Sequence, residues 1–331
     1  MKPSSNNRCA LDVRAVSHDG RIVATKSPYG GKNMELFDVA KGLYLGRRSL
    51  EKGRMCFGST PQIFFTSGKQ VKCWNLDSGA CLWTYCFPQE RKAWQYVDFL
   101  PRLGLLLVGT CEAHRVEEHM PDDDGVILLD ASTGAFVREI KPFELEFTSD
   151  EEYAANAPVL DGKTSKFFVD VLQTSDWRTV DRIDLGYYPG YTRLSVVGRC
   201  LLVETADRAG VALYLIETDG KLRAVGSYPE LRSSRTLVHR RRQRFVIYPC
   251  QESNDEPFRR LEICAISGEI LEDLELPAGS VEPRYGRTVL GDDYILDDSG
   301  TITDLDDGSV LRSGLFELIP DWPDEPVRWE F

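Results

Sequence analysis

The fold of this chain is indicated first by one stretch of sequence, Gln70-Val71-Lys72-Cys73-Trp74-Asn75-Leu76-Asp77-Ser78-Gly79-Ala80-Cys81-Leu82-Trp83. Two runs of alternating apolar and polar residues flank an Asp-Ser-Gly turn. Alternation with a period of two is typical of β-strands. The glycine supplies the positive φ that such a hairpin turn requires. The stretch therefore predicts a β-hairpin, and long helical periodicity is nearly absent from the rest of the chain.

The same hairpin recurs along the sequence. Copies with a turn glycine occupy residues 37–42, 129–134, 216–220, 265–268 and 305–308, and a weaker copy occupies 174–177, where Asp176 takes the place of the glycine. The turn positions 42, 79, 134, 176, 220, 268 and 308 are separated by 37, 55, 42, 44, 48 and 40 residues. Repeats of about 40–50 residues with four strands each are typical of propeller blades.

A second hairpin precedes these turns. The best preserved copy covers residues 15–24, and weaker copies cover 159–169 and 237–248. Two hairpins in each repeat give four strands in each unit. We therefore predict an all-β fold, a seven-bladed β-propeller of four-stranded antiparallel blades that forms a single domain over residues 1–331. Six or eight blades remain alternatives, because the fourth repeat is the faintest.

Two of these segments resemble a known superfamily. The Ser-x-Asp-Gly-Arg turn at 17–21 and the segment Trp74–Trp83 look like the WD-repeat and quinoprotein-like β-propellers. The resemblance covers nearly all of the chain and is specific in the first three blades. The Gly-His pair of WD repeats is missing, and their Trp-Asp dipeptide is Trp74-Asn75 here. The resemblance implies an interaction platform that usually has no chemistry of its own.

Composition and charge narrow the class of protein further. The chain has 331 residues, 42% of them hydrophobic and 28% charged, which is typical of a globular protein. Its formal net charge of −12 argues against a nucleic-acid partner. No apolar run reaches the roughly 18–20 residues that span a bilayer, and the first seven residues lack the apolar stretch of a secretion signal. We expect no membrane association.

The cysteines indicate a reducing compartment. The chain has nine of them, an odd number, and no two form a Cys-x-x-Cys pair. Several lie inside apolar runs that read as strands, where a cysteine serves as a small core residue. We therefore expect a cytoplasmic protein.

In WD-repeat propellers, the connections between blades share one face with the connections between second and third strands. By this resemblance the longest connection on that face is 111–125, which holds two of the four histidines and six carboxylates, among them His114, Glu117, Glu118 and His119. A divalent metal site is one interpretation. However, the two histidines are five residues apart and the calcium-loop pattern is missing. We predict a protein-contacting loop, with a solvated acidic loop as the alternative.

Aromatic residues of neighbouring inter-blade connections should extend this face. They are Trp94, Tyr96, Tyr187, Tyr188 and Tyr191. Trp and Tyr on an exposed rim are typical anchors of protein interfaces. The alternative is that some of these rings seal the gaps between blades. Between them, residues 149–152 match a helix capping box, which predicts a short helix up to Asn156.

The opposite face carries a basic cluster around the turn that includes Arg240, Arg241, Arg242 and Arg244. One interpretation is an anion-binding patch for phosphate, an acidic peptide or nucleic acid. The alternative is a charged turn that balances nearby Asp-rich turns.

Nothing in the sequence predicts a catalytic, cofactor or metal site. Gly-x-Ser-x-Gly, Gly-x-Gly-x-x-Gly and the phosphate-binding GxxxxGK are absent, and the paired aspartates lie at hairpin ends, where Asp forms turns. The aromatic tail 320–331 predicts either a closing strand, with 327–331 pairing with 8–13, or a docking segment.

The resulting hypothesis is a non-enzymatic WD-repeat-like propeller that binds a protein or peptide, as a scaffold or as a subunit of an intracellular complex. The alternative is a propeller enzyme, a hydrolase or lyase, with a metal or acidic site at the central channel.

Overall fold

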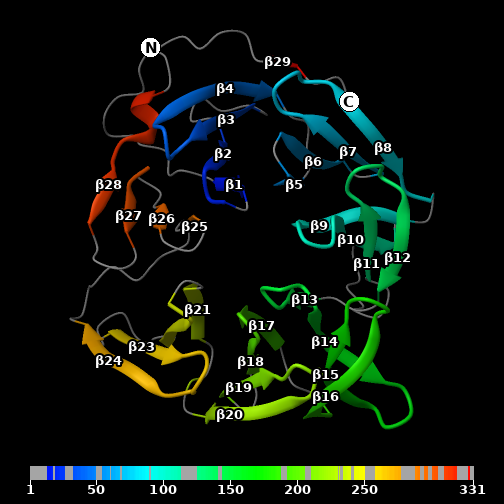
Figure 1. Ribbon diagram of the computed structural model, residues 1–331, viewed down its shortest axis with the longest axis vertical. Helices are drawn as coiled ribbons and strands as arrows, with labels where there is room; N and C mark the ends of the chain where they lie inside the picture. Colours follow the sequence, from blue (N-terminus) through cyan, green and yellow to red (C-terminus); the bar gives the residue numbers. More distant parts are fainter. Residues whose placement is uncertain are drawn as a thin grey trace. The chain divides into compact units, whose positions relative to one another are not determined.

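The structure is a computed structural model. It describes residues 13–17, 19–26, 33–49, 54–59, 61–67, 69–88, 91–112, 125–140, 144–187, 192–205, 210–229, 231, 234–239, 242–249, 258–276, 288–290, 294–296, 300–304, 309–318 and 327–328. These residues are almost entirely β-strands and turns (Figure 1). The helix among them is one 3-10 turn, η2 (Leu315–Leu318). No described helix has the length and apolar character needed to cross a membrane.

The described strands form seven antiparallel sheets, each built from four strands consecutive in sequence. We number the sheets in chain order. Sheet 1 is β1 (Val13–Val16), β2 (Ile22–Lys26), β3 (Asn33–Asp38) and β4 (Leu43–Ser49); sheet 2 is β5 (Arg54–Phe57), β6 (Gln62–Ser67), β7 (Gln70–Asn75) and β8 (Cys81–Cys86). Sheet 3 is β9 (Arg91–Leu100), β10 (Leu105–Glu112), β11 (Gly125–Asp130) and β12 (Phe136–Ile140); sheet 4 is β13 (Glu144–Phe147), β14 (Tyr153–Asp161), β15 (Lys166–Gln173) and β16 (Arg178–Gly186). Sheet 5 is β17 (Thr192–Val197), β18 (Cys200–Thr205), β19 (Gly210–Ile216) and β20 (Leu222–Tyr228); sheet 6 is β21 (Ser234–His239), β22 (Arg244–Pro249), β23 (Phe258–Cys264) and β24 (Ile270–Leu276). Sheet 7 is β25 (Thr288–Leu290), β26 (Tyr294–Leu296), β27 (Ile302–Asp304) and β28 (Val310–Arg312).

Each of the seven predicted hairpins joins the third and fourth strands of a different sheet. In sheet 7 the turn itself lies outside the described residues. Gly79 and Gly134 have the positive φ expected of them, 67° and 73°. In sheet 4 the predicted substitute for the glycine, Asp176, is wrong by one residue. Trp177 adopts φ 62°, and its N–H donates to Gln173 O as that of Gly134 does to Asp130 O.

Every one of these outer hairpins contains a β-bulge at the same place. One residue near the start of the fourth strand has no partner in the register, and in all seven sheets that residue is leucine or valine: Leu45, Leu82, Val137, Val180, Val225, Leu271 and Leu311. A bulge bends the strand and increases its twist. Side chains at or beside the bulge then reach the turn of the next sheet. Val180 packs against Gly220, Val225 against Gly268 and Trp83 against Gly134.

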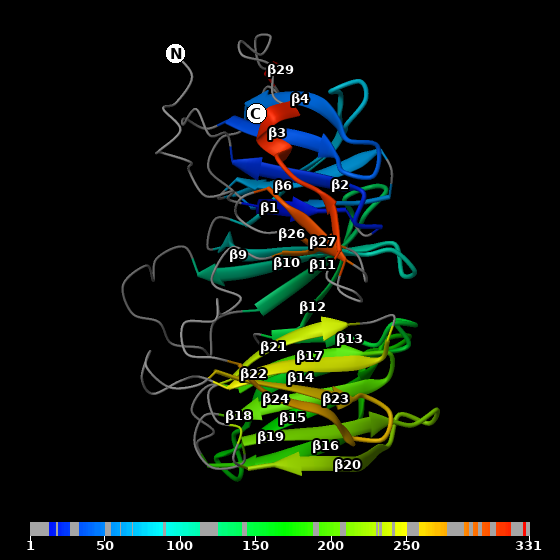
Figure 2. The same cartoon turned by 90° about the vertical axis from the view of Figure 1, so that its left-hand side faces the viewer.

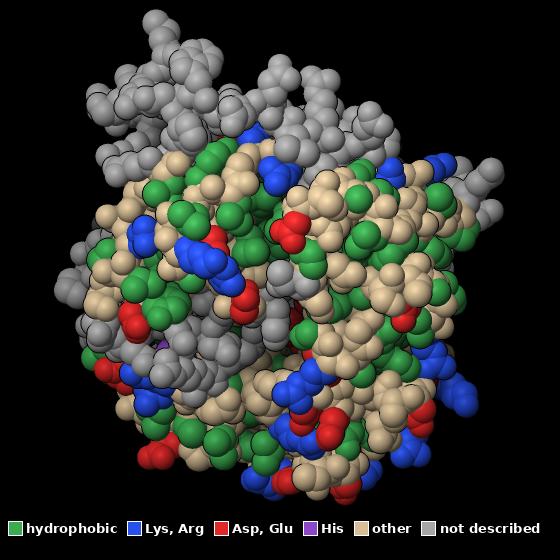
Figure 3. Space-filling view, turned by 45° about the horizontal axis from the view of Figure 1, so that its top comes forward, with side chains coloured by type: hydrophobic (Ala, Val, Ile, Leu, Met, Phe, Trp, Pro, Cys, Tyr) green, Lys and Arg blue, Asp and Glu red, His purple; other side chains and the backbone are tan. Residues whose placement is uncertain are grey.

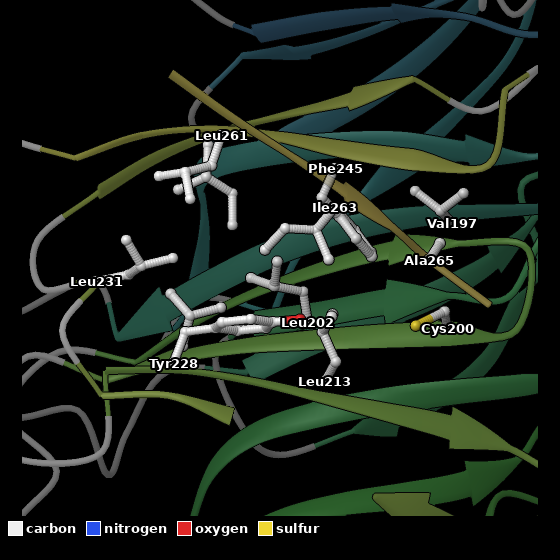
Figure 4. Close-up of a cluster of buried hydrophobic side chains, with 12 residues drawn as sticks. Val197, Cys200, Leu202, Leu213, Tyr228, Leu231, Phe245, Leu261, Ile263 and Ala265 are labelled. Atoms are coloured by element: carbon white, nitrogen blue, oxygen red, sulfur yellow. The ribbon is translucent and has the colours of Figure 1, made fainter. Parts of the chain in front are cut away.

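The buried hydrophobic clusters lie between sheets 1 and 2, 2 and 3, 7 and 1, 4 and 5, and 5 and 6. Between sheets 5 and 6, Leu202, Phe245 and Ile263 are fully buried and point toward one another (Figure 4). Leu201 and Val203, the neighbours of Leu202 in β18, pack instead against sheet 4. Because successive side chains of a strand point to opposite faces, one strand fills two layers. Strands buried on both faces read as continuous apolar runs.

Contacts between residues divide the chain into two compact units. The first unit is Met1–Ile140 with Pro283–Phe331, and the second is Lys141–Glu282. Sheets 1, 2, 3 and 7 belong to the first unit and sheets 4, 5 and 6 to the second. The single domain expected over 1–331 stays a prediction.

The helix predicted after residue 149 is wrong. Residues 149–152 form the turn between β13 and β14, and Tyr153 begins a strand. Asp150 holds the turn, because its Oδ1 accepts hydrogen bonds from the Glu152 N–H and the Thr148 hydroxyl, whereas Ser149 Oγ, the expected cap, accepts one from the Gly198 N–H. β14 pairs with both β13 and β15. These pairings supply hydrogen-bond partners for the backbone N–H and C=O groups that a helix would have paired within itself.

Two residues of the aromatic tail form a strand, β29 (Val327–Arg328). It pairs in parallel with β4, the outer strand of sheet 1, so that Val327 lies opposite Arg48 and Arg328 opposite Ser49. The order from β1 to β4 can be followed in Figures 1 and 2. The predicted partner of the tail is 8–13, of which the structure describes Val13 alone. The role of the tail as closing strand or docking segment stays a prediction.

Candidate functional site

The connections of each sheet are sorted between its two ends. In sheet 3, Glu112 at the end of β10 lies opposite Arg91 at the start of β9. The connection between second and third strands therefore leaves from the same end as the connection that enters the sheet. At the opposite end of sheet 4, the turn between its first and second strands lies beside the turn between its third and fourth strands. Thr174 Oγ1 in the β15–β16 turn donates to Glu151 O in the β13–β14 turn at 2.6 Å. We call these the loop end and the turn end of a sheet.

The predicted contact loop leaves from the loop end of sheet 3. β10 ends at Glu112 and β11 begins at Gly125, so the loop connects the second and third strands as expected. The four residues chosen for partner contact, His114, Glu117, Glu118 and His119, lie outside the described residues. Their role in binding stays a prediction.

Trp94 and Tyr96 lie within β9, whereas the sequence pattern predicts a connection between blades there. Val97 pairs with Val108 and Ala93 with Thr110, which leaves residues 94–96 opposite Gly109 alone. β9 begins earlier in the sequence than its apolar alternation indicates. The reason is that β10 extends to Glu112, which pairs with Arg91. The side chains of residues 91–96 are outside the described part of the chain.

Tyr187 is the described member of the tyrosine group. It follows β16 at the loop end of sheet 4, and its side chain is 69% exposed. Lys166 Nζ lies 5.9 Å from the centre of its ring and 2.6 Å from Asp184 Oδ2. The hydrogen bond to Asp184 raises the pKa of Lys166, so the cation beside the ring persists at neutral pH. Tyr188 and Tyr191 lie outside the described residues.

The predicted residues fall into both compact units. Trp94, Tyr96 and the loop after Glu112 belong to the first unit, and Tyr187, Tyr188 and Tyr191 belong to the second. Each group therefore forms a candidate surface of its own unit.

The predicted anion-binding turn is partly neutralised within sheet 6. Arg244 Nη1 lies 2.7 Å from Glu262 Oε2, and Glu262 is also paired with Arg260. Arg242 is exposed at the turn end, and Arg240 and Arg241 lie outside the described residues. On the face in Figure 3 the described Lys and Arg side chains are mixed with Asp and Glu. Arg244 is thus paired within its own sheet, and the anion-binding role of the turn stays a prediction.

Buried carboxylates on the third strands are a feature that sequence reasoning missed. Glu35 in β3 is fully buried and lies opposite Arg47 in β4, with Arg47 Nε 2.9 Å from Glu35 Oε1. Asp170 in β15 lies opposite Arg182 in β16 at the equivalent position, with Nη2 3.1 Å from Oδ1. Each acid stands three residues before the residue that begins the outer turn, a spacing that the sequence contains.

The hydrogen-bond partners of both carboxylates lie in the neighbouring fourth strand of the same sheet. Tyr44 Oη donates to Glu35 Oε2 at 2.6 Å, so both oxygens of Glu35 are engaged. Burial raises the pKa of Asp170, and Arg182 opposes the shift. Within the described ranges, no group of three or more His, Cys, Asp and Glu side chains is placed to hold a metal ion.

Cys264 occupies a turn position that other sheets give to Asp or Asn. Asp130 Oδ1 accepts hydrogen bonds from the N–H groups of Ser132 and Thr133 at the start of its turn. Cys264 is in the same place, because its N–H donates to Glu269 O at 2.9 Å as the Asp130 N–H donates to Ala135 O at 2.8 Å. A hydrogen bond from the Ser267 hydroxyl, with further ones from backbone N–H groups, lowers the pKa of the Cys264 thiol.

Alkylation should distinguish Cys264 from the buried cysteines. Burial raises the pKa of Cys73 and of Cys200 to about 12. In the folded protein, we expect iodoacetamide to label Cys264 with a midpoint at lower pH than an unperturbed thiol, and to leave Cys73 and Cys200 unlabelled. Peptide mass spectrometry over a pH series measures this. Ser267→Ala should move the Cys264 midpoint to higher pH, and an unchanged midpoint would show that the hydroxyl does not stabilise the thiolate.

Comparisons with known proteins identify the fold. No protein-family model matches the chain, and no curated protein matches it. Among solved structures, a chain of the mitotic checkpoint complex matches with a TM-score of 0.57 and 10% identity, covering 91% of this chain and 85% of its own. Hydrazine synthase of Kuenenia stuttgartiensis matches with a TM-score of 0.55 and 9% identity, covering 95% and 98%. A eukaryotic initiation factor matches with a TM-score of 0.51 and 13% identity, covering 88% and 83%.

These likenesses are to structures and not to sequences, so they indicate the fold alone. They agree with the repeated four-stranded antiparallel sheets. The chain therefore has an all-β, propeller-type fold built from repeated four-stranded antiparallel sheets.

Proposed function

We propose that this chain is a non-enzymatic propeller that binds a protein or peptide partner, as a scaffold or as a subunit of an intracellular complex. The observation that carries the proposal is the exposed ring of Tyr187 at the loop end of sheet 4. A tyrosine gives a large apolar contact area together with a polar tip, and few rotamers are lost when it binds. Lys166 and Asp184 flank the ring and supply polar contacts at its rim.

Two further features support the proposal. The odd number of cysteines and the lack of a Cys-x-x-Cys pair suit a protein of a reducing cytoplasm. The net charge of −12 does not suit a nucleic-acid partner, whereas a protein partner requires no overall basic field. In the first unit, the loop with His114, Glu117, Glu118 and His119 is a second predicted contact region.

Tyr187→Ala should weaken partner binding at least tenfold and leave stability nearly unchanged, because an exposed side chain contributes little to folding and an interface anchor contributes more than about 1.4 kcal/mol. The partner captured by the wild-type chain from native lysate is identified by mass spectrometry, and its affinity for each variant is then measured by titration.

Phe136→Ala is the matched control. Phe136 is also an exposed aromatic side chain, 53% accessible, but it lies at the start of β12, next to the turn end of sheet 3. Equal loss of binding in both variants, or loss in neither, would contradict a role for the loop end. A tightly held metal ion in the same purified sample would contradict the non-enzymatic part of the proposal and would favour the hydrolase or lyase alternative.

A further inference from the structure

The outer edge of sheet 1 differs from the other outer edges that the structure describes. β4 carries an additional strand, β29, whereas the fourth strands of the other six sheets end their sheets (Figure 1). An outer strand presents a row of unpaired N–H and C=O groups that can accept an extended segment. The edge of β4 therefore already binds a strand in this chain, in parallel orientation.

Arg48, the residue opposite Val327, has no counter-ion among the described residues. Arg47, its neighbour, points toward Glu35, and Tyr44 occupies the second oxygen of that carboxylate. Arg48 lies opposite Met34 instead, because adjacent side chains of a strand point to opposite faces. Its Nη1 donates to the backbone oxygen of Arg47 at 3.0 Å, and its Nε is buried without an acceptor in the described part of the chain.

An unpaired guanidinium that is half-buried is unfavourable by itself. No opposite charge among the described residues offsets its desolvation, and burial lowers the pKa of Arg48. A carboxylate bound at this edge would balance the charge of the Arg48 guanidinium and accept a hydrogen bond from its Nε. The backbone edge and Arg48 thus favour the same ligand, an extended segment that carries acidic side chains.

The charges of the two segments are complementary. Residues 43–54 contain four basic residues, Arg47, Arg48, Lys52 and Arg54, and one acidic residue, Glu51. Residues 320–331 contain four acidic residues, Asp321, Asp324, Glu325 and Glu330, and one basic residue, Arg328. We propose that the outer edge of β4, together with Arg48, is a docking site for an extended acidic segment, and that the chain's own segment 320–331 occupies it until an acidic strand of a partner displaces it.

The segment 320–331 is attached to the same chain as β4, which explains how a pairing of only two residues is sufficient. A segment attached to the same chain has an effective concentration in the millimolar range, so a weak contact suffices within the molecule. A free strand must compete with that concentration, and its apparent affinity is reduced accordingly. The edge of β4 shares no residue with the loop end of sheet 4, so the two surfaces can be tested separately.

The experiment titrates a fluorescein-labelled peptide of residues 320–331 with the full-length chain and follows anisotropy. Val327→Pro removes a backbone N–H from the internal strand and should raise peptide affinity at least tenfold over wild type. Adding Arg48→Glu to Val327→Pro should lower the affinity at least tenfold again. Adding Arg102→Glu, which changes an exposed arginine in the turn between β9 and β10, should leave it within about twofold.

Three results would overturn the proposal. They are equal affinity in wild type and Val327→Pro, equal effects of Arg48→Glu and Arg102→Glu, and equal binding of a peptide with the same composition in scrambled order. If Val327→Pro lowers the melting temperature, the chain with Asp324→Asn, Glu325→Gln and Glu330→Gln replaces it. This variant weakens the internal segment through charge alone and should bind the wild-type peptide at least threefold more tightly than the unchanged chain does; no gain would overturn the proposal as well.

Discussion

Replacing Gly134 with alanine is expected to lower the free energy of unfolding by about 2–5 kcal/mol. Gly134 has φ +73°, a conformation that costs an L-residue about 1–2 kcal/mol. A Cβ there would lie 2.5 Å from Cε3 of Trp83. The indole cannot turn away freely, because its Nε1 donates to Ala131 O at 3.0 Å. Overpacking of this kind adds about 1–3 kcal/mol.

Gly104→Ala separates these two contributions. Gly104 lies in the same sheet with a similar φ of +64°, but no atom lies within 4 Å of a Cβ placed there. We expect a loss of about 1–2 kcal/mol, from the backbone conformation alone. Urea unfolding of wild type and both variants measures the difference. Equal losses would mean that Trp83 moves aside and that the joint between sheets 2 and 3 is not closely packed.

Replacing Glu35 with alanine is expected to cost about 3–5 kcal/mol, the usual effect of removing one partner of a buried ion pair. The change leaves the Arg47 guanidinium buried without its carboxylate and removes the acceptor of the Tyr44 hydroxyl. Burial, the largest cause of the raised pKa of Tyr44, persists in the variant, so this hydroxyl stays protonated and does not replace the missing charge.

A double substitution tests the cause. The variant Glu35→Met, Arg47→Met should be more stable than Glu35→Ala, because it removes both charges of the pair and fills the space with apolar side chains. Glu217→Ala is the surface control. Glu217 pairs with Arg223 at 2.7 Å, but both side chains are exposed, and the expected loss is below about 1 kcal/mol. Similar losses for Glu35→Ala and Glu217→Ala would show that burial does not govern the effect.

The sequence carried more information on the outer hairpins than on any other feature. Asn75 and Asp130 accept hydrogen bonds from the N–H groups two and three residues later, which is why Asp, Asn, Ser and Gly recur at these turns. A signal of the bulge was also present, since Leu82 and Val137 each follow the turn glycine by three residues. The same spacing from Trp177 to Val180 identifies the fourth repeat, whose glycine is missing.

Local signals were insufficient where long-range pairing competed with them. Residues 149–152 match a capping box, yet they form a turn, because the strand that follows pairs on both sides. Trp94 and Tyr96 follow a polar stretch that reads as a loop, yet they lie in β9. In both cases backbone hydrogen bonds to a neighbouring strand outweigh a local preference worth about 1 kcal/mol.

The sequence by itself determined the all-β class, the repeat and the position of the outer turns, since these depend on period-two alternation and on turn chemistry within a few residues. Tertiary structure alone decided the pairing of Glu35 with Arg47, the lack of a described counter-ion at Arg48 and the placement of β29 beside β4. The reason is physical. Register between strands fixes which charges meet and which remain alone, and it depends on how residues far apart in the chain pack together.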